Sequence, residues 1–156
     1  MRGLALISAL AAAPASADAL REFSRNCFSP LLTAAKAEAA FNGLRYDFYD
    51  LRPFSNVAPS EARAKVTPGT DRRCEVALDG DHSDAAARTV TDALNREGIR
   101  REAPVPDTHP ATDGTALLAA RYLNPNRIAV VHVGTRPGPN GIETFLNVER
   151  LTPLTE

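Results

Sequence analysis

Three strand-like runs near the C-terminal end constrain the fold of this chain most strongly. They cover residues 115–123, 127–133 and 142–151, with turn residues between them at 124–126 and 135–141. Strands that follow one another through short turns pair antiparallel, so these runs predict a meander. The middle run is apolar on both faces apart from His132, which predicts a position in the centre of a sheet.

The residues before this meander alternate between helical and extended patterns. Apolar residues at spacings of three and four predict helices over 19–28, 30–41 and 83–97. A period of two predicts a strand over 44–51, and shorter strands are expected over 74–78 and 99–103. We therefore expect an α+β domain with an antiparallel sheet of about five strands and helices packed on one face.

Residues 1–17 have the pattern of an export signal. Arg2 supplies a positive charge, residues 4–12 form an apolar run, and small residues follow as a cleavage site. The apolar run is about half of the roughly 20 residues that a membrane-spanning helix needs. We predict a signal peptide that ends at Ala17 and a single domain over 18–156, located in the periplasm and without membrane insertion.

Cys27 and Cys74 are the two cysteines of the chain. In an oxidising compartment, an isolated pair of cysteines is typical of a disulfide. The alternative is a reactive or metal-binding thiol, but no C-x-x-C motif occurs and no histidine lies near either cysteine in sequence. A bridge would also tether the segment 52–71, a proline-containing loop of a length that is uncommon unless it is functional or tied down.

Composition narrows the classes of partner. The net charge is −1 at pH 7, which favours neither nucleic acid nor an anionic membrane surface. No phosphate-binding loop, dinucleotide-binding glycine pattern or serine-nucleophile motif occurs in the sequence, and we expect no cofactor. The expected partner is a protein or small molecule of the cell envelope.

The densest polar cluster lies between a predicted strand and a predicted helix. It consists of Asp79, Asp81, His82 and Asp84, whose carboxylates and imidazole are suitable ligands for a divalent cation. The spacing differs from that of a calcium-binding loop. Acidic residues also stabilise the N-terminus of a helix without any ligand, and both interpretations are kept.

Two further features are candidates for function. His132 is expected to be a partly buried, hydrogen-bonded core residue, with general-base catalysis as the alternative. His109, in a proline-rich loop, is expected to be exposed to solvent. The segment 135–141 has two prolines that limit its conformations, so Arg136, Pro137 and Asn140 are predicted to present a rigid interaction loop, unless the segment is an ordinary hairpin connection.

Two runs of the chain resemble segments of small exported proteins from alphaproteobacteria. The runs are YDFYDL at 46–51 and TPGTDRRCEV at 67–76, and the similarity extends through 129–139. The resemblance implies an exported single domain and indicates no catalytic residues.

These observations favour an exported accessory or binding protein without evident catalytic machinery. Two alternatives remain at this point. One is a small metal-dependent hydrolase that uses Asp79, Asp81 and His82. The other is a structural subunit of an envelope assembly that pairs through an exposed sheet edge.

Overall fold

The computed structural model describes residues 15–60 and 65–151. Within these ranges the elements are α1 (Ala15–Asn26), α2 (Ala34–Ala40), β1 (Arg45–Asp50), β2 (Thr70–Asp79), α3 (Ser83–Arg96), β3 (Glu102–Ala103), β4 (Thr115–Asn124), β5 (Arg127–Gly138) and β6 (Gly141–Leu151). The strands form one antiparallel sheet in the order β1-β2-β6-β5-β4-β3. The predicted α+β class is confirmed. The sheet has six strands because the short edge strand β3 also pairs with β4.

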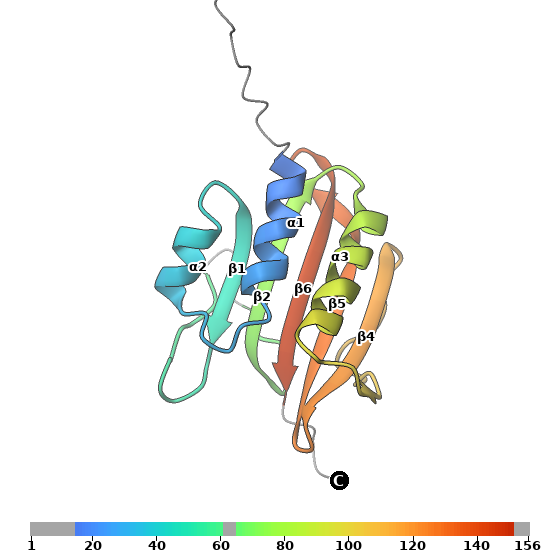
Figure 1. The fold of residues 1–156 in the computed structure, drawn as a ribbon. Helices are drawn as coiled ribbons and strands as arrows, with labels where there is room; N and C mark the ends of the chain where they lie inside the picture. The colour runs from blue at the N-terminus through green and yellow to red at the C-terminus, as the bar shows by residue number, and fades with distance from the viewer. Residues whose placement is uncertain (1–14, 61–64, 152–156) are drawn as a thin grey trace, which may run out of the picture.

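The helices α1, α2 and α3 lie on the same face of the sheet (Figure 1). Successive residues of a strand point to opposite faces, so alternate strand residues meet the helices. The resulting core is apolar, and its buried members include Phe23, Ala37, Val90 and Leu94 from the helices and Phe48, Val76, Val131, Val133, Leu146 and Val148 from the strands. Burial of this surface is the main driving force for the helical layer.

The helix α2 begins later than its predicted start at residue 30. Thr33 is its N-cap, and the Thr33 hydroxyl accepts a hydrogen bond from the backbone N–H of Lys36 at 3.3 Å. The carbonyl groups of Ser29 and Leu32 instead accept hydrogen bonds from the buried Arg72 guanidinium, at 2.8 and 3.2 Å. The segment before Thr33 therefore adopts a turn that presents its carbonyls to an arginine from the sheet.

The predicted disulfide between Cys27 and Cys74 is present and joins the end of α1 to β2, with the two Cα atoms 5.4 Å apart. It lies on the helix face and is not the tether of the long loop after β1, so that prediction was wrong. Val57 pairs with Asp50 through backbone hydrogen bonds of 2.7 and 3.0 Å. Nearer β2, the Thr67 hydroxyl donates to the Glu149 carboxylate at 3.0 Å.

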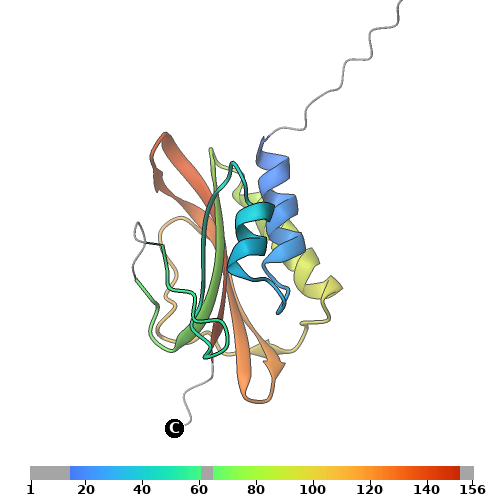
Figure 2. The same cartoon turned by 90° about the vertical axis from the view of Figure 1, so that its left-hand side faces the viewer.

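Loops cover the face of the sheet opposite the helices. The segment 104–114 and the described parts of the segment between β1 and β2 lie on this side of the sheet in Figure 2. A small apolar cluster of Ala120, Ile128, Val130 and Leu151 lies beneath them. We call this side the helix-free face, and it carries the residues discussed below.

The predicted signal peptide lies largely outside the described residues, which begin at Ala15. Cleavage after Ala17 would fall in the first turn of α1, whereas the buried residues of this helix start at Ala19. The core contacts of α1 are thus contributed by residues after the predicted cleavage site. No helix within the described ranges is both long enough and apolar enough to cross a membrane.

Candidate binding site on the helix-free face

The register of the strands places four polar residues in a row across the helix-free face. Asp47 on β1 pairs with Glu75 on β2, Glu75 pairs with Asn147 on β6, and Asn147 pairs with His132 on β5. Because directly opposed residues share a face, these side chains line up over the sheet. Three of the four, Glu75, Asn147 and His132, line a pocket.

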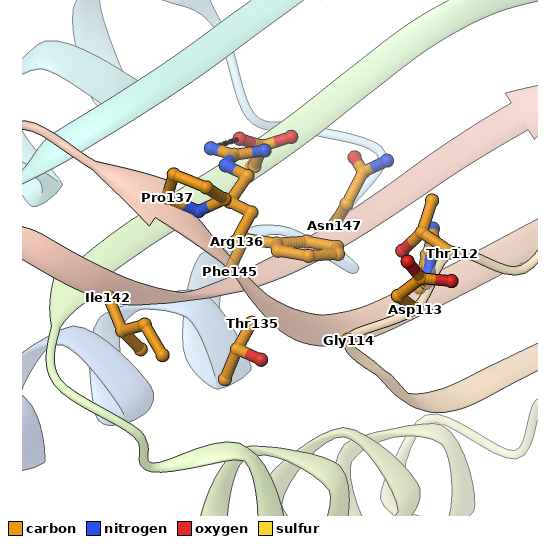
Figure 3. A pocket seen from close by; sticks show the side chains of 11 residues that line it. Thr112, Asp113, Gly114, Thr135, Arg136, Pro137, Ile142, Phe145 and Asn147 are labelled. Carbon is orange, nitrogen blue, oxygen red and sulfur yellow. Dashed lines mark hydrogen bonds and ion pairs between the residues drawn. The ribbon is translucent and has the colours of Figure 1, made fainter.

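The pocket has a volume of about 730 Å³. Its lining residues come from β2, β5, β6 and the segment before β4, and they are Glu75, Thr112, Asp113, Gly114, His132, Thr135, Arg136, Pro137, Ile142, Phe145 and Asn147. Arg136 and Pro137 lie at one end, Thr112 and Asp113 lie at the other, and Phe145 and Asn147 lie between them (Figure 3). The pocket therefore combines charged, hydrogen-bonding and aromatic groups.

Arg136 is held in a fixed position by two carboxylates. Its Nη2 donates to Glu75 at 2.6 Å and its Nε donates to Glu143 at 2.7 Å. The guanidinium carbon lies 4.8 Å from the centroid of the Phe145 ring, which is cation–π geometry. The side chain keeps 31% of its surface exposed, so it remains accessible from the pocket.

The prediction that Arg136 sits at the tip of an interaction loop was wrong. β5 continues through Pro137 to Gly138, and Gly138 pairs directly with Gly141 of β6. Only a tight turn is left outside the strands, where the side-chain amide of Asn140 donates to Asp79 at 3.1 Å. A strand can include proline at a position where the backbone N–H makes no hydrogen bond to a neighbouring strand. Composition alone does not show which positions of a strand are of this kind.

His132 is half-buried and hydrogen-bonded, as predicted. Its Nε2 lies 2.8 Å from the Thr115 hydroxyl, and its ring meets the Phe145 ring edge to face with centroids 5.0 Å apart. Burial lowers the pKa of His132, and the nearby His109 and Arg136 lower it further. The imidazole is therefore neutral at neutral pH and contributes a hydrogen-bonding group to the pocket.

The structure separates the residues of the predicted metal site. The carboxylate of Asp79 bonds to Arg45 at 2.7 Å, and the carboxylate of Asp81 accepts from the Ser83 hydroxyl at 2.6 Å. His82 and Asp84 lie at the start of α3, where His82 is the N-cap residue. Across residues 15–60 and 65–151, no group of three His, Cys, Asp or Glu side chains could hold a metal ion. The bonds of Asp79 and Asp81 agree with the alternative interpretation, in which these acidic residues flank the N-terminus of α3 without a ligand.

A cluster of buried charges lies beside the pocket. Glu149 and Asp47 each have 1% of their surface exposed. Arg73 Nε donates to Glu149 at 2.5 Å, and Arg73 Nη1 lies 3.6 Å from Asp47. His109 Nε2 is in hydrogen-bond contact with the other oxygen of Glu149. We call these four residues the Glu149 cluster.

The Glu149 cluster overturns one sequence expectation and adds residues that pattern analysis missed. His109 was expected to be exposed to solvent, but it is buried, with 8% of its surface exposed. The alternation of β6 placed Glu149 on the more polar face, but it gave no sign that two loops would bury this carboxylate. No local signal identifies such a pair, because His109 and Glu149 are far apart in sequence and meet only through the sheet.

The pKa values in the cluster follow from its contacts. Burial alone would raise the pKa of Glu149, but the hydrogen bond from His109 and the charge of Arg73 hold it below its usual value. Burial raises the pKa of Tyr49, which is 0% exposed next to this cluster, to about 12. Glu149 is therefore ionised and Tyr49 is neutral at physiological pH.

Comparisons of the chain with protein families, curated proteins and solved structures found no match. The resemblance to exported alphaproteobacterial proteins stays a prediction. Function is therefore argued from the geometry of the site.

Proposed function

We propose that this protein is an exported binding protein that holds a small polar molecule in the pocket of the helix-free face. The observation that carries the proposal is the convergence, in one pocket of about 730 Å³, of side chains from four separate segments. A concave site with an aromatic floor and a few oriented polar groups is the usual form of a small-molecule site.

The rigidity of the pocket walls supports this proposal. A Cβ at Gly134 would lie 2.5 Å from the carbonyl oxygen of Gly114, and a Cβ at Gly114 would lie 2.0 Å from that of Thr135. These glycines let the segment before β4 pack directly against β5, and the Thr135 N–H donates to the Gly114 carbonyl at 2.9 Å. A preformed wall lowers the entropy that a ligand loses on binding.

The lining residues indicate the chemistry of the ligand. The accessible Arg136 guanidinium suits a hydrogen-bond acceptor such as a hydroxyl, carbonyl or carboxylate oxygen. At the other end, the exposed Asp113 carboxylate suits an N–H or O–H donor. Between these two ends, the Phe145 ring offers apolar contact (Figure 3). We infer a ligand that carries donors and acceptors at separated positions, with an apolar portion between them.

Ligand binding can be tested by titrating the isotopically labelled protein with small sugars, amino acids and polyamines while recording amide chemical shifts. At least one class should produce saturable shifts that centre on Arg136, Phe145 and Asn147. Arg136→Gln should weaken this binding by about tenfold or more, the effect of losing a charged hydrogen bond. The matched control is Arg96→Gln, which changes a 51% exposed arginine on α3, on the face of the sheet opposite the pocket (Figure 1).

Two results would contradict the pocket as the binding site. The first is an absence of saturable shifts with every class. The second is equal binding by wild type and Arg136→Gln.

The exported location rests on the disulfide, since such bonds form and persist in oxidising compartments. Intact-mass analysis of the protein isolated from its native cells should show a chain that begins at Asp18, with the two thiols of Cys27 and Cys74 oxidised. A mass that includes Met1, or free thiols at both positions after alkylation under non-reducing conditions, would refute export.

A further inference from the structure

Six charged residues gather where β1 and β6 end and β2 and β5 begin, at the lower end of the sheet in Figure 1. Asp50 is directly opposed to Arg72, and Arg72 is directly opposed to Arg150. Arg72 lies two residues before the core residue Cys74 and therefore faces the helices. Arg150, two residues after the core residue Val148, faces the same way. We call the group the Arg72 cluster, which consists of Asp50, Arg52, Asp71, Arg72, Arg127 and Arg150.

The two aspartates of the cluster are paired with its more exposed arginines. Arg52 Nη2 donates to the Asp50 carboxylate at 2.5 Å. Arg127 donates through both of its terminal nitrogens to the Asp71 carboxylate, at 2.7 and 2.5 Å. The side chains of Arg52 and Arg127 keep 20% and 21% of their surface exposed. These two arginines therefore form an accessible rim, where a solute anion can make contact.

The two buried arginines of the cluster are short of partners. Arg150 is 8% exposed and donates to the carbonyl of Phe28, and within the described residues it forms no ion pair with a carboxylate. Arg72 is 2% exposed, and its Nε lies 3.7 Å from Asp50, beyond hydrogen-bond distance. In the same part of the chain, Arg72 Nε and Nη1 have no hydrogen-bond partner. Buried polar groups are normally bonded, so Arg72 has unused donors.

The Arg72 cluster carries a surplus of positive charge. Burial lowers the pKa of Arg72 and of Arg150 to about 10, and repulsion from the neighbouring arginines contributes, yet both groups stay protonated at neutral pH. Four guanidinium groups against two carboxylates leave a surplus of two positive charges. The loop over 27–33, which supplies carbonyl groups to Arg72 and Arg150, contains no charged residue. A dianion would balance the cluster.

A phosphate group has the charge and the geometry that the cluster lacks. It carries between about −1.5 and −2 at pH 7, and its oxygens accept paired N–H groups from guanidinium. A carboxylate would balance only one of the two surplus charges. We propose that the Arg72 cluster binds a phosphate group, which contacts Arg52 and Arg127 at the rim and is attracted by Arg72 and Arg150 behind them. This site lies apart from the pocket and does not depend on the proposed function.

Binding can be measured on the full-length isotopically labelled protein, with inorganic phosphate as the probe. Phosphate is titrated at constant ionic strength against chloride, because salt screens every exposed charge. The amide signals of Asp71, Arg127 and Arg150 should show saturable shifts with phosphate. Equal shifts in chloride, or phosphate shifts that centre on Arg136 in the pocket, would overturn the site.

Two variants of the rim identify the binding groups. Arg52→Gln and Arg127→Gln should each weaken phosphate binding by about tenfold or more, the effect of losing a charged hydrogen bond. Two rim variants keep the test available if one fails to fold. The matched control is Arg21→Gln, which removes the same charge from an arginine on α1 that is 45% exposed, and it should bind phosphate as wild type does. Wild-type affinity in both rim variants, or an equal loss in the control, would contradict the proposal.

A second titration distinguishes the sources of the phosphate group. Its probe is glycerol 3-phosphate, a soluble monoester that carries the group on an organic molecule. Tighter binding of this monoester would support the site and identify a phosphorylated organic molecule as the ligand class. Equal or tighter binding of inorganic phosphate would support the site and identify the free ion. An absence of saturable shifts with both probes would refute the site and leave the pocket of the helix-free face untouched.

Discussion

Arg72 and Arg73 are neighbours in the sequence and face opposite sides of the sheet. Arg72 is 2% exposed on the helix face, where it holds the carbonyls of Ser29 and Leu32, and burial lowers its pKa to about 10. Arg73 lies on the helix-free face and contacts Glu149 and Asp47. The period of two along a strand thus gives adjacent, chemically identical residues separate structural roles.

Removal of Arg73 should be strongly destabilising. Arg73→Met leaves Glu149 buried with a weaker cationic environment, so the free energy of unfolding should fall by about 3–5 kcal/mol. The matched control is Arg21→Met, because Arg21 is 45% exposed and pairs with Asp18 in solvent. That variant should lose far less stability than Arg73→Met, because an ion pair in solvent contributes little. Urea denaturation measures the free energy of unfolding of both variants. Equal decreases in the two variants would show that burial of the Glu149 cluster does not contribute to stability.

The loop between α1 and α2 is held to the sheet by three residues from two strands. Cys74 on β2 bonds covalently to Cys27, Arg72 holds two carbonyls of the loop, and Arg150 on β6 donates to the carbonyl of Phe28 at 2.5 Å. Arg72 and Arg150 are directly opposed across β2 and β6. Like charges in this position repel, and the loop carbonyls offset that repulsion.

Reduction of the disulfide should destabilise the attachment of this loop and of α1. The bridge spans 47 residues of sequence, for which the chain-entropy relation gives about 4 kcal/mol of stabilisation. The urea midpoint of wild type should fall when a reductant is added. The Cys27→Ser/Cys74→Ser double variant should have the lower midpoint from the start and should not respond to reductant. An unchanged wild-type midpoint after complete reduction would contradict this expectation.

The whole molecule contains two layers with different chemistry on the two faces of one sheet. Helices cover one face, where the apolar core lies together with the buried Arg72 and Arg150, whereas loops cover the other face over the Glu149 cluster (Figure 2). Burial alone would raise the pKa of Asp50, but hydrogen bonds from Arg52 lower it below its usual value. The pKa of Glu149 is also below its usual value, because the effects of His109 and Arg73 outweigh the effect of burial. The stability of the molecule is therefore linked to pH.

The sign of this linkage predicts acid sensitivity. A carboxyl with a lower pKa in the folded state stabilises the fold above its unfolded pKa of about 4, and this contribution is lost as the pH falls through the folded pKa. The free energy of unfolding should therefore decrease from about pH 5 downwards. Asp50→Asn should make this decrease shallower. A stability that is constant between about pH 5 and about pH 2.5, or an unchanged slope in the variant, would contradict the prediction.

The sequence alone determined the elements and the class of fold. The strand-like runs over 115–123, 127–133 and 142–151 identified β4, β5 and β6, and the period of two over 44–51 identified β1, whereas β2 begins at Thr70, four residues before its predicted start. The spacing of Ala86, Val90, Ala93 and Leu94 identified α3, because such a pattern follows from local geometry and from burial of one face. The pairing of Cys27 with Cys74 followed from there being only two cysteines.

Only the tertiary structure decided where the polar residues meet. Arg136 joins Glu75 and Glu143, and His109 reaches Glu149, through strand register and loop packing that involve residues distant in sequence. Electrostatic and hydrogen-bond energies depend on these distances and on exclusion of water, neither of which is encoded in a local pattern. The candidate site therefore became visible when the sheet brought β2, β5 and β6 together.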